Sequence, residues 1–169
     1  MAIFPIRMYG DPVLRTPTVP VEVVDDSVRK LVADLIETMY DAPGVGLAAN
    51  QIGVSRRVAV FDAHDGEGAR PLINPVIVET EGELEFEEGC LSVPGHYWPI
   101  IRPEFARVRS LDLDGNQVEY CGGDLLGRVL QHEIGHLDGD LLIDHLPRWT
   151  RKQALKELRE ELLAPPLEP

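Results

Sequence analysis

Apolar residues recur at the spacing of an amphipathic helix in three segments of the chain, and short β-like segments lie between them. The first helical segment runs from about Val28 to Asp41, and Asp25-Asp26-Ser27 supplies side chains that cap a helix N-terminus. Pro43-Gly44 stops it. Its apolar positions are Val28, Leu31, Val32, Leu35, Ile36 and Met39. We therefore predict an N-terminal helix that packs one face on the core.

The second helical segment, from about Gly123 to Leu137, is apolar on two faces. One stripe contains Leu125 and Val129 together with His132 and His136. The other stripe contains Leu126, Leu130, Ile134 and Leu137. A helix that is apolar on two faces is buried, so we predict that this is the central helix of the fold.

The two ends of the chain differ in pattern. Residues 1–24 are interrupted by Pro5, Pro12, Pro17 and Pro20, and we predict an extended arm that wraps over the body. The last helical segment begins at about Arg148, and Ala164-Pro165-Pro166 ends it. Its apolar positions are Leu155, Leu158 and Leu162.

The middle of the chain has the composition of β-strands. We predict strands at Arg57–Asp62 and Leu72–Thr80. Pro75 in the second strand indicates an edge strand or a strand start, because proline has no N–H to donate. Phe105–Leu113 and Gln117–Cys121 form a predicted hairpin around an Asp-Gly-Asn turn.

Composition limits the classes of function. Of 169 residues, 16 are Lys or Arg and 29 are Asp or Glu, and the net charge of −13 argues against a broad binding surface for nucleic acid or anionic lipid. The acidic segment Glu79–Glu88 is predicted to be solvated. No stretch approaches the ~20 apolar residues of a membrane span, and no signal peptide is visible. We expect one domain, residues 1–169, in the cytoplasm, where Cys90 and Cys121 stay reduced.

The segment Gln131–His136 carries candidate chemistry. On a helix, His132 and His136 lie four residues apart on one face, so both imidazoles can reach one metal ion. Glu133 leaves the same turn at a different angle and points toward a bound water, as a general base would. A lone histidine on an apolar face is more often a core residue, but two at ligand spacing with a glutamate between them indicate a metal site.

A catalytic metal site normally has three protein ligands and one open position. The metzincin pattern needs a histidine at position 142, which is Leu. A zincin-like peptidase could recruit a glutamate of the last helix, namely Glu157, Glu160 or Glu161. Cys90 in Glu88–Gly95 is the favoured third ligand, and a buried cysteine in a turn is the alternative. A binding module with a structural Cys–His–His site is a further alternative, although structural zinc sites usually have four ligands.

Residues 43–53 hold three glycines and two alanines, which leaves little side chain to pack. The simplest explanation is a turn between the first helix and the next strand. The functional explanation is that something must come close to the backbone here, with Gln51 as the polar side chain available to it.

Three segments of the chain resemble, in order and spacing, the three signature motifs of the peptide deformylase family. They are Gly44–Gln51, Glu88–Ser92 and Gln131–His136. The resemblance extends through most of the chain, including Ile73-Asn74-Pro75 and the first helix. It implies an enzyme that removes the N-formyl group from the N-terminal formyl-methionine of newly made polypeptides and releases formate. With the predicted elements, it implies an α+β fold in which antiparallel and mixed β-sheets pack around the central HExxH helix, flanked by an N-terminal amphipathic helix and a C-terminal helix.

The resemblance also implies roles for individual residues. The metal ligands would be Cys90, His132 and His136, and the family's metal is natively Fe²⁺, with Zn²⁺, Ni²⁺ or Co²⁺ able to replace it. Glu133 would move the proton, and Gln51 with the backbone N–H of Leu91 would hydrogen-bond the oxyanion. Residues that bind the substrate would be Gly46, through its backbone, and Val45, Leu125 and Val129, which would line the methionine pocket. The implied partners are formyl-methionyl nascent peptides.

Two features depart from the family pattern. Most relatives carry Asp where this chain has Gly135. Glycine at this position costs up to roughly 1 kcal/mol of helix stability. Metal ligation is not affected, because position 135 is not a ligand. Glycine occurs here in some actinobacterial members, so we interpret this HExGH motif as a subfamily trait. The last helix mixes Arg151, Lys152 and Lys156 with glutamates, unlike the basic helix that docks some members on the ribosome. This argues against docking through the helix and leaves only a transient ribosome contact as an expectation.

The remaining polar residues receive simpler interpretations. Cys121 closes a predicted strand and is expected in the core, while His64, His96 and His145 are expected to be surface or hydrogen-bonded residues. The segment Gly95–Pro99 either borders a substrate groove or forms a packed surface loop.

Overall fold

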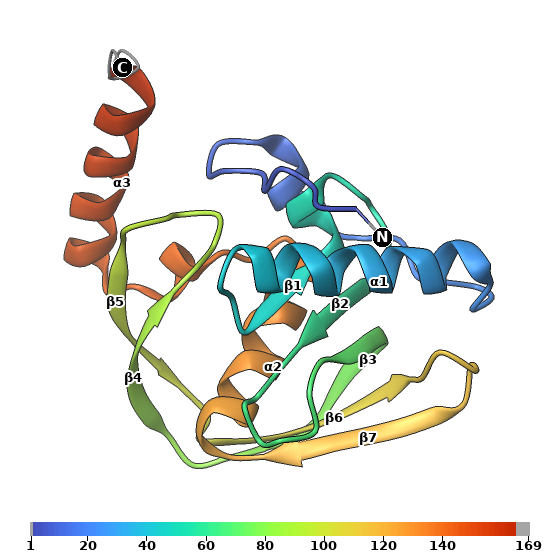
Figure 1. The fold of residues 1–169 in the computed structure, drawn as a ribbon. Helices are drawn as coiled ribbons and strands as arrows, with labels where there is room; N and C mark the ends of the chain where they lie inside the picture. The colour runs from blue at the N-terminus through green and yellow to red at the C-terminus, as the bar shows by residue number, and fades with distance from the viewer. Residues whose placement is uncertain (1, 165–169) are drawn as a thin grey trace.

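The computed structural model describes residues 2–164, which form three α-helices and two antiparallel sheets (Figure 1). The helices are α1 (Asp26–Asp41), α2 (Asp124–Leu137) and α3 (Arg148–Leu163), with short 3-10 helices at Pro12–Arg15, Ala49–Ile52 and Leu142–His145. The strands are β1 (Gly46–Ala48), β2 (Val58–Phe61), β3 (Arg70–Glu81), β4 (Leu84–Gly89), β5 (Tyr97–Arg102), β6 (Phe105–Leu111) and β7 (Gln117–Gly122). One sheet has the order β1-β2-β3-β6-β7, and the other pairs β4 with β5. The α+β prediction is confirmed. Among the described residues, Val19 and Arg56 form an isolated parallel β-bridge outside the two sheets.

Strand β2 lies between helices α1 and α2. Its side chains alternate, with Val58 and Val60 in the apolar cluster of α1 and Ala59 and Phe61 in the cluster of α2. All four side chains are fully buried. A strand that is covered on both faces is apolar at consecutive positions, which explains the run Val-Ala-Val-Phe. The predicted central position of α2 is therefore confirmed, because α2 covers the sheet face opposite α1.

Strand β3 is the middle strand of its sheet and Pro75 lies inside it, so the prediction that Pro75 marks an edge strand or a strand start was wrong. The ladder between β2 and β3 ends at Ile73, and the β3–β6 register shifts between Ile73 and Val76. Pro75 thus lies at a β-bulge beyond the end of β2, where its missing N–H breaks no ladder bond.

Strands β1, β4 and β5 are absent from the sequence-based prediction. The acidic segment Glu79–Glu88 was predicted to be solvated, yet its second half belongs to β4 (Leu84–Gly89), which pairs with β5. The prediction was wrong for Glu88 in particular, which is only 5% exposed. Side chains alternate across a strand, and Glu88 lies on the side of β4 that faces α2, as its contacts with Arg128 and His132 show.

The predicted N-terminal arm is confirmed for residues 2–24, and it is hydrogen-bonded to all three motif regions. The N–H of Arg7 donates to the carbonyl of Gln51 at 2.7 Å, and that of Tyr9 donates to Ser92 at 2.9 Å. The N–H of Thr18 donates to the carbonyl of Leu137 at the end of α2, also at 2.9 Å. The arm therefore braces the backbone behind the candidate site.

The prediction that Cys121 lies in the core was wrong. Cys121 is exposed, because β7 is an edge strand of the sheet and the side of the strand that carries Cys121 faces solvent. Leu162 is 60% exposed, and α3 instead buries Ala154 and Leu158. The predicted stop at Pro165-Pro166 lies outside the described residues.

In the described part of the chain, no helix has both the length and the apolar character that crossing a membrane requires.

Candidate metal centre

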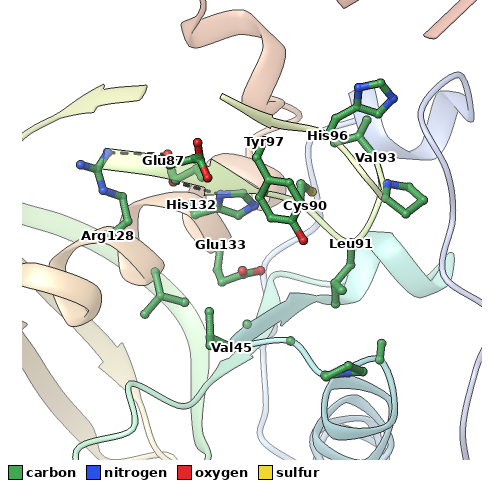
Figure 2. A pocket seen from close by; sticks show the side chains of 18 of the residues that line it. Val45, Glu87, Cys90, Leu91, Val93, His96, Tyr97, Arg128, His132 and Glu133 are labelled. Carbon is green, nitrogen blue, oxygen red and sulfur yellow. Dashed lines mark hydrogen bonds and ion pairs between the residues drawn. The ribbon is translucent and has the colours of Figure 1, made fainter. Parts of the chain in front are cut away.

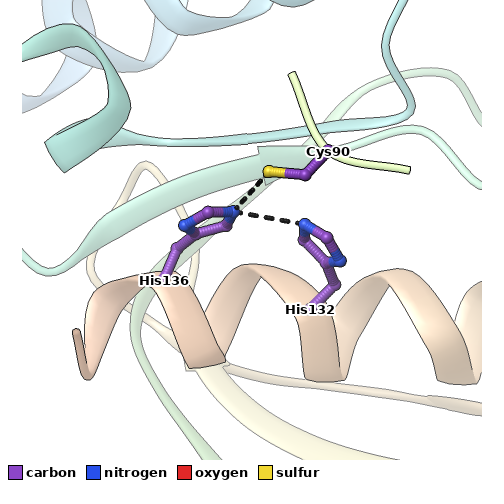
Figure 3. Close-up of side chains that lie close together, drawn as sticks. All are labelled: Cys90, His132 and His136. Atoms are coloured by element: carbon purple, nitrogen blue, oxygen red, sulfur yellow. Dashed lines mark hydrogen bonds between the residues drawn. The ribbon is translucent and has the colours of Figure 1, made fainter. Parts of the chain in front are cut away.

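The two histidines of α2 point their rings to the same side of the helix (Figure 3). The Nε2 atoms of His132 and His136 lie 3.2 Å apart, and the ring centroids lie 4.9 Å apart. His136 is 1% exposed. The spacing of four residues therefore brings both nitrogens to one point, as predicted for a shared ligand set.

Cys90 completes the group from another part of the chain. It follows β4 directly, and its Sγ lies 3.2 Å from Nε2 of His136 (Figure 3). The ligand atoms of Cys90, His132 and His136 all lie within 4.8 Å of one another, and among the described residues this is the group of His, Cys, Asp and Glu side chains that could hold a metal. In a tetrahedral site with metal–nitrogen bonds of about 2.0–2.1 Å, two ligand nitrogens are about 3.3 Å apart. The observed spacing fits a divalent metal ion.

Neighbouring side chains in the site shift the pKa values of Cys90 and His132. Burial alone would raise the pKa of the Cys90 thiol, but His136 and His132 beside it hold that pKa well below its ordinary value. Burial would lower the pKa of His132, and the neighbouring Cys90 and Glu88 raise it instead. A thiolate is the form of cysteine that binds metals, so the lowered pKa favours the metal-binding form of Cys90.

Glu133 lies beside the ligands with its carboxylate buried. The residue is 3% exposed, and its Oε2 has no hydrogen-bond partner among the described residues. Burial raises the pKa of Glu133 to about 6, against the opposing effect of His132 and His136. A buried acceptor without a partner is costly, and a pKa near neutrality suits a group that takes up and releases a proton.

The approach of Glu133 explains a glycine in the first motif. A Cβ on Gly46 would lie 2.2 Å from Oε1 of Glu133, which is closer than any side chain can come. Gly46 belongs to β1, so the glycine-rich segment is more than the turn considered from the sequence. The close approach predicted there is confirmed, and at Gly46 the approaching group is the carboxylate of α2.

Gln51 is held in one orientation by its neighbours. Its Oε1 accepts the N–H of Ala48 at 2.9 Å, and its Nε2 donates to Oγ of Ser92 at 3.1 Å. The same Nε2 lies 3.8 Å from Sγ of Cys90. Because the N–H of Ala48 can only donate, the amide nitrogen of Gln51 must face the metal side of the site.

The site opens into a cavity of about 450 Å³ (Figure 2). Its walls include every residue predicted from the sequence to act at the site except His136, which lies deeper: Val45, Gly46, Gln51, Cys90, Leu91, Leu125, Val129, His132 and Glu133. Phe86 and Arg128 line the cavity and were not predicted, and Tyr97 lines it from the Gly95–Pro99 segment. His96 also lines it, so the Gly95–Pro99 segment borders the groove. These residues come from β4, β5 and the helix face beside the motif, where the sequence carries no ligand spacing.

Glu88 is the most consequential residue that the sequence analysis missed. Its carboxylate accepts from Nε of Arg102 at 2.9 and 3.1 Å and lies 3.3 Å from Nδ1 of His132. Burial would raise the pKa of Glu88, but His132 and Arg102 hold it below its ordinary value. The sequence signals were its position two residues before Cys90 and its place at the start of the second signature motif, Glu88–Ser92.

The alternative ligands from α3 are not near the metal centre. Glu161 instead pairs with Nε2 of His96 at 2.9 Å, and Glu157 accepts from Nε2 of Gln153 at 2.7 Å. His145 pairs with Asp140 and His64 lies 3.8 Å from Asp62, so these histidines have the surface or hydrogen-bonded roles predicted for them. The zincin-like arrangement is therefore not supported.

Gly135 lies beside a carboxylate. A Cβ on Gly135 would lie 3.3 Å from Oδ2 of Asp140, whose N–H donates to the carbonyl of Gly135 at 2.9 Å. The same carboxylate pairs with His145. Asp140 thus stands where a side chain at position 135 would project, and an acidic residue there would meet a like charge.

We expect Gly135→Asp to be less stable than Gly135→Asn, because the two side chains have the same shape but only Asp adds a charge near Asp140. Like-charged neighbours on a helix cost about 0.2–0.5 kcal/mol, and we expect a difference of this order in the free energy of unfolding. Urea denaturation of the metal-free variants at low salt measures it. Adding Asp140→Asn to both should shrink the difference to the part due to the helix dipole. Equal stabilities of the two single variants would contradict this account.

Known proteins resemble this chain over nearly all of its length. A sequence model described as polypeptide deformylase matches residues 3–152. A peptide deformylase of Acidothermus cellulolyticus is 50% identical over 160 residues, covering 95% of this chain and 88% of that relative. One of Pseudomonas aeruginosa is 46% identical over 163 residues, covering 95% of this chain and 97% of the relative.

Solved structures agree with the sequence matches. A crystal structure of a peptide deformylase from Legionella pneumophila superposes with a TM-score of 0.87 at 45% identity and covers 97% of this chain and all (100%) of that one. The Ehrlichia chaffeensis peptide deformylase in complex with actinonin superposes with a TM-score of 0.89 at 36% identity, covering 97% and 100% of the two chains. The chain therefore belongs to the peptide deformylase family, and it is a metal-dependent hydrolase that removes the N-formyl group from nascent peptides.

Proposed function

We propose that Cys90, His132 and His136 hold the metal ion and that Fe²⁺ is the native metal, with Zn²⁺, Ni²⁺ or Co²⁺ as substitutes. The observation that carries this proposal is the convergence of the three ligand atoms on the wall of a cavity that also contains Glu133. Three protein ligands are typical of a catalytic site that keeps one position open. When bound, the metal would lower the pKa of its water toward neutrality and polarise the formyl carbonyl.

We assign proton transfer to Glu133. Its buried carboxylate takes a proton from the attacking water and delivers it to the leaving amine as the C–N bond breaks. The raised pKa supports this role, because a base with a pKa near neutrality can both accept and return a proton. The absence of a partner for Oε2 among the described residues leaves this oxygen available to water.

Gln51 and the backbone N–H of Leu91 are the proposed donors to the oxyanion of the tetrahedral intermediate. The orientation that Ala48 and Ser92 impose on the Gln51 amide supports its assignment. Leu91 follows the ligand Cys90 directly, so its N–H belongs to the wall of the same cavity. Each such donor is typically worth about 2.7–4 kcal/mol in the transition state.

The peptide is proposed to bind along β1. This strand is at the edge of the five-stranded sheet and pairs with β2 on one side, so its other edge can receive an extended peptide. Gly46 would offer its backbone, and Val45, Leu125 and Val129 would line the pocket for the methionine side chain. All four residues border the cavity, which supports this arrangement.

Formate release from a formyl-Met-Ala-Ser peptide by anaerobically purified protein tests the reaction, with metal analysis of the same sample. We expect formate together with about one equivalent of iron or a substitute metal per chain, as a single three-ligand site implies. Metal-loaded protein that releases no formate would overturn the proposed roles of Glu133, Gln51 and Leu91.

Replacing Gly46 with Ala is expected to lower kcat by about 10²-fold, because the new methyl group must displace the carboxylate of Glu133. Gly123→Ala is the matched control, since a Cβ there lies 3.6 Å from the carbonyl of Glu104, an ordinary contact. Kinetics of formate release on both metal-loaded variants decide the outcome. A Gly46→Ala enzyme with the kcat of the parent would show that Glu133 can move without consequence.

Several broader assignments remain proposals. We infer that residues 1–169 form one catalytic domain acting in the cytoplasm on formyl-methionyl nascent chains, with no direct nucleic-acid or membrane binding. A contact with the ribosome would be transient, because α3 presents basic and acidic side chains together. The HExGH form of the motif supports placing the chain among the actinobacterial-like members of the family.

A further inference from the structure

Glu88 is a buried carboxylate to which the proposed mechanism gives no role. It lies on β4, two residues before the ligand Cys90, with its side chain 5% exposed. Its contacts come from the metal ligand His132 and from two arginines, and all three are hydrogen-bond donors. An ionised group is retained in such a place only when its neighbours satisfy it.

The contact with His132 determines which nitrogen of the ring faces the metal. Oε1 of Glu88 lies 3.3 Å from Nδ1 of His132. On the opposite side of the ring, Nε2 of His132 lies 3.2 Å from Nε2 of His136. A carboxylate can only accept, so it requires a proton on Nδ1, and Nε2 is the nitrogen that faces the ligand group.

Two arginines hold the carboxylate in place. Nε of Arg102, on β5, donates to both oxygens of Glu88 at 2.9 and 3.1 Å. Arg128, one turn before His132 on α2, lies 3.6 Å from Oε2 of Glu88. Arg128 also donates to the carbonyls of Leu84 at 2.7 Å and Ile100 at 3.0 Å, so it ties α2 to both strands of the small sheet.

The geometry points to Glu88 as a positioning residue. We propose that Glu88, held by Arg102 and Arg128, accepts the Nδ1–H of His132 and keeps its Nε2 turned toward Cys90 and His136 before any metal arrives. The same strand end then supplies both the ligand Cys90 and the group that orients a second ligand. Because Arg102 and Arg128 already hold Glu88 in place, less free energy is needed to assemble the site. Loss of the Glu88 carboxylate therefore weakens metal binding as well as turnover.

Glu88→Gln tests the proposal with little change in shape. Every neighbour of the carboxylate is a donor, so the amide NH₂ of Gln must face a donor whichever way it turns. Zn²⁺ affinity is measured by competition with a chromophoric chelator. We expect Glu88→Gln to bind Zn²⁺ about 10–100-fold more weakly than the parent, the usual loss when a partner of a metal ligand is removed. Glu85→Gln, the same change at an exposed position on β4, should leave the affinity within about twofold.

Nitrogen NMR of the Zn²⁺-loaded protein supplies a readout that a purely structural role would not move. In the parent, the His132 ring should be protonated at Nδ1, and Glu88→Gln should shift that resonance while Glu85→Gln does not. Protonation of Nε2 in the parent, or a Glu88→Gln affinity within about twofold of the parent, would overturn the proposal. If Glu88→Gln does not fold, the spectrum of the parent protein still decides the tautomer of His132. Arg102→Lys then takes the place of Glu88→Gln in the affinity test, and we expect it to bind Zn²⁺ more weakly than the parent.

Discussion

Glu133→Gln is expected to lower the turnover of formyl-methionyl peptide by about 10²–10⁴-fold while the metal content stays unchanged. The amide keeps the shape of the side chain against Gly46 but cannot accept and return a proton. Because Glu133 is not among the three ligand atoms that converge, its replacement removes no metal ligand. Steady-state kinetics of formate release and metal analysis of the same preparation measure both quantities.

Glu85→Gln provides the control for Glu133→Gln, because it makes the same chemical change at an exposed site on β4. It should retain the parental kcat and metal content. A Glu133→Gln protein that has lost its metal would show that Glu133 supports the ligands instead of moving the proton. Full turnover by a metal-loaded Glu133→Gln protein would assign proton transfer to another group.

Cys90→Ala is expected to abolish turnover by a different route, through loss of the metal. The sulfur of Cys90 is one of three ligands, and its lowered pKa favours the anionic form that binds a metal. Without the metal, the pKa of water is no longer lowered toward neutrality, and formate release should fall to background. The measurements are metal content after dialysis against a weak chelator and formate release with metal restored in excess.

Cys121→Ala is the matched control for Cys90→Ala, since Cys121 is exposed on the edge strand β7, outside the ligand group. It should keep both its metal and its activity. Retention of tightly bound metal by Cys90→Ala would mean that another side chain supplies the third ligand, and the Cys–His–His assignment would then be wrong.

The residues of the site were predictable to different degrees. His132, Glu133 and His136 follow from helical spacing alone, because one turn of α2 sets their relative positions. Cys90 was one of several third-ligand candidates on residue chemistry, and the family resemblance singled it out. Glu88 was misjudged, because in sequence it is one acidic residue among many, and its burial depends on how β4 packs against α2 and β5.

The sequence by itself determined the helices, the strands β2, β3, β6 and β7 within a few residues, and the pair of histidines on one face of α2. Local spacing and turn chemistry specify these features. Only the tertiary structure decided which distant groups meet. Cys90 reaches His136 across 46 residues, and Glu88 reaches His132 across 44. The closeness of Glu133 to Gly46 is likewise a product of packing between α2 and β1. Such contacts depend on how whole elements pack together, so they leave no periodic signal in the sequence.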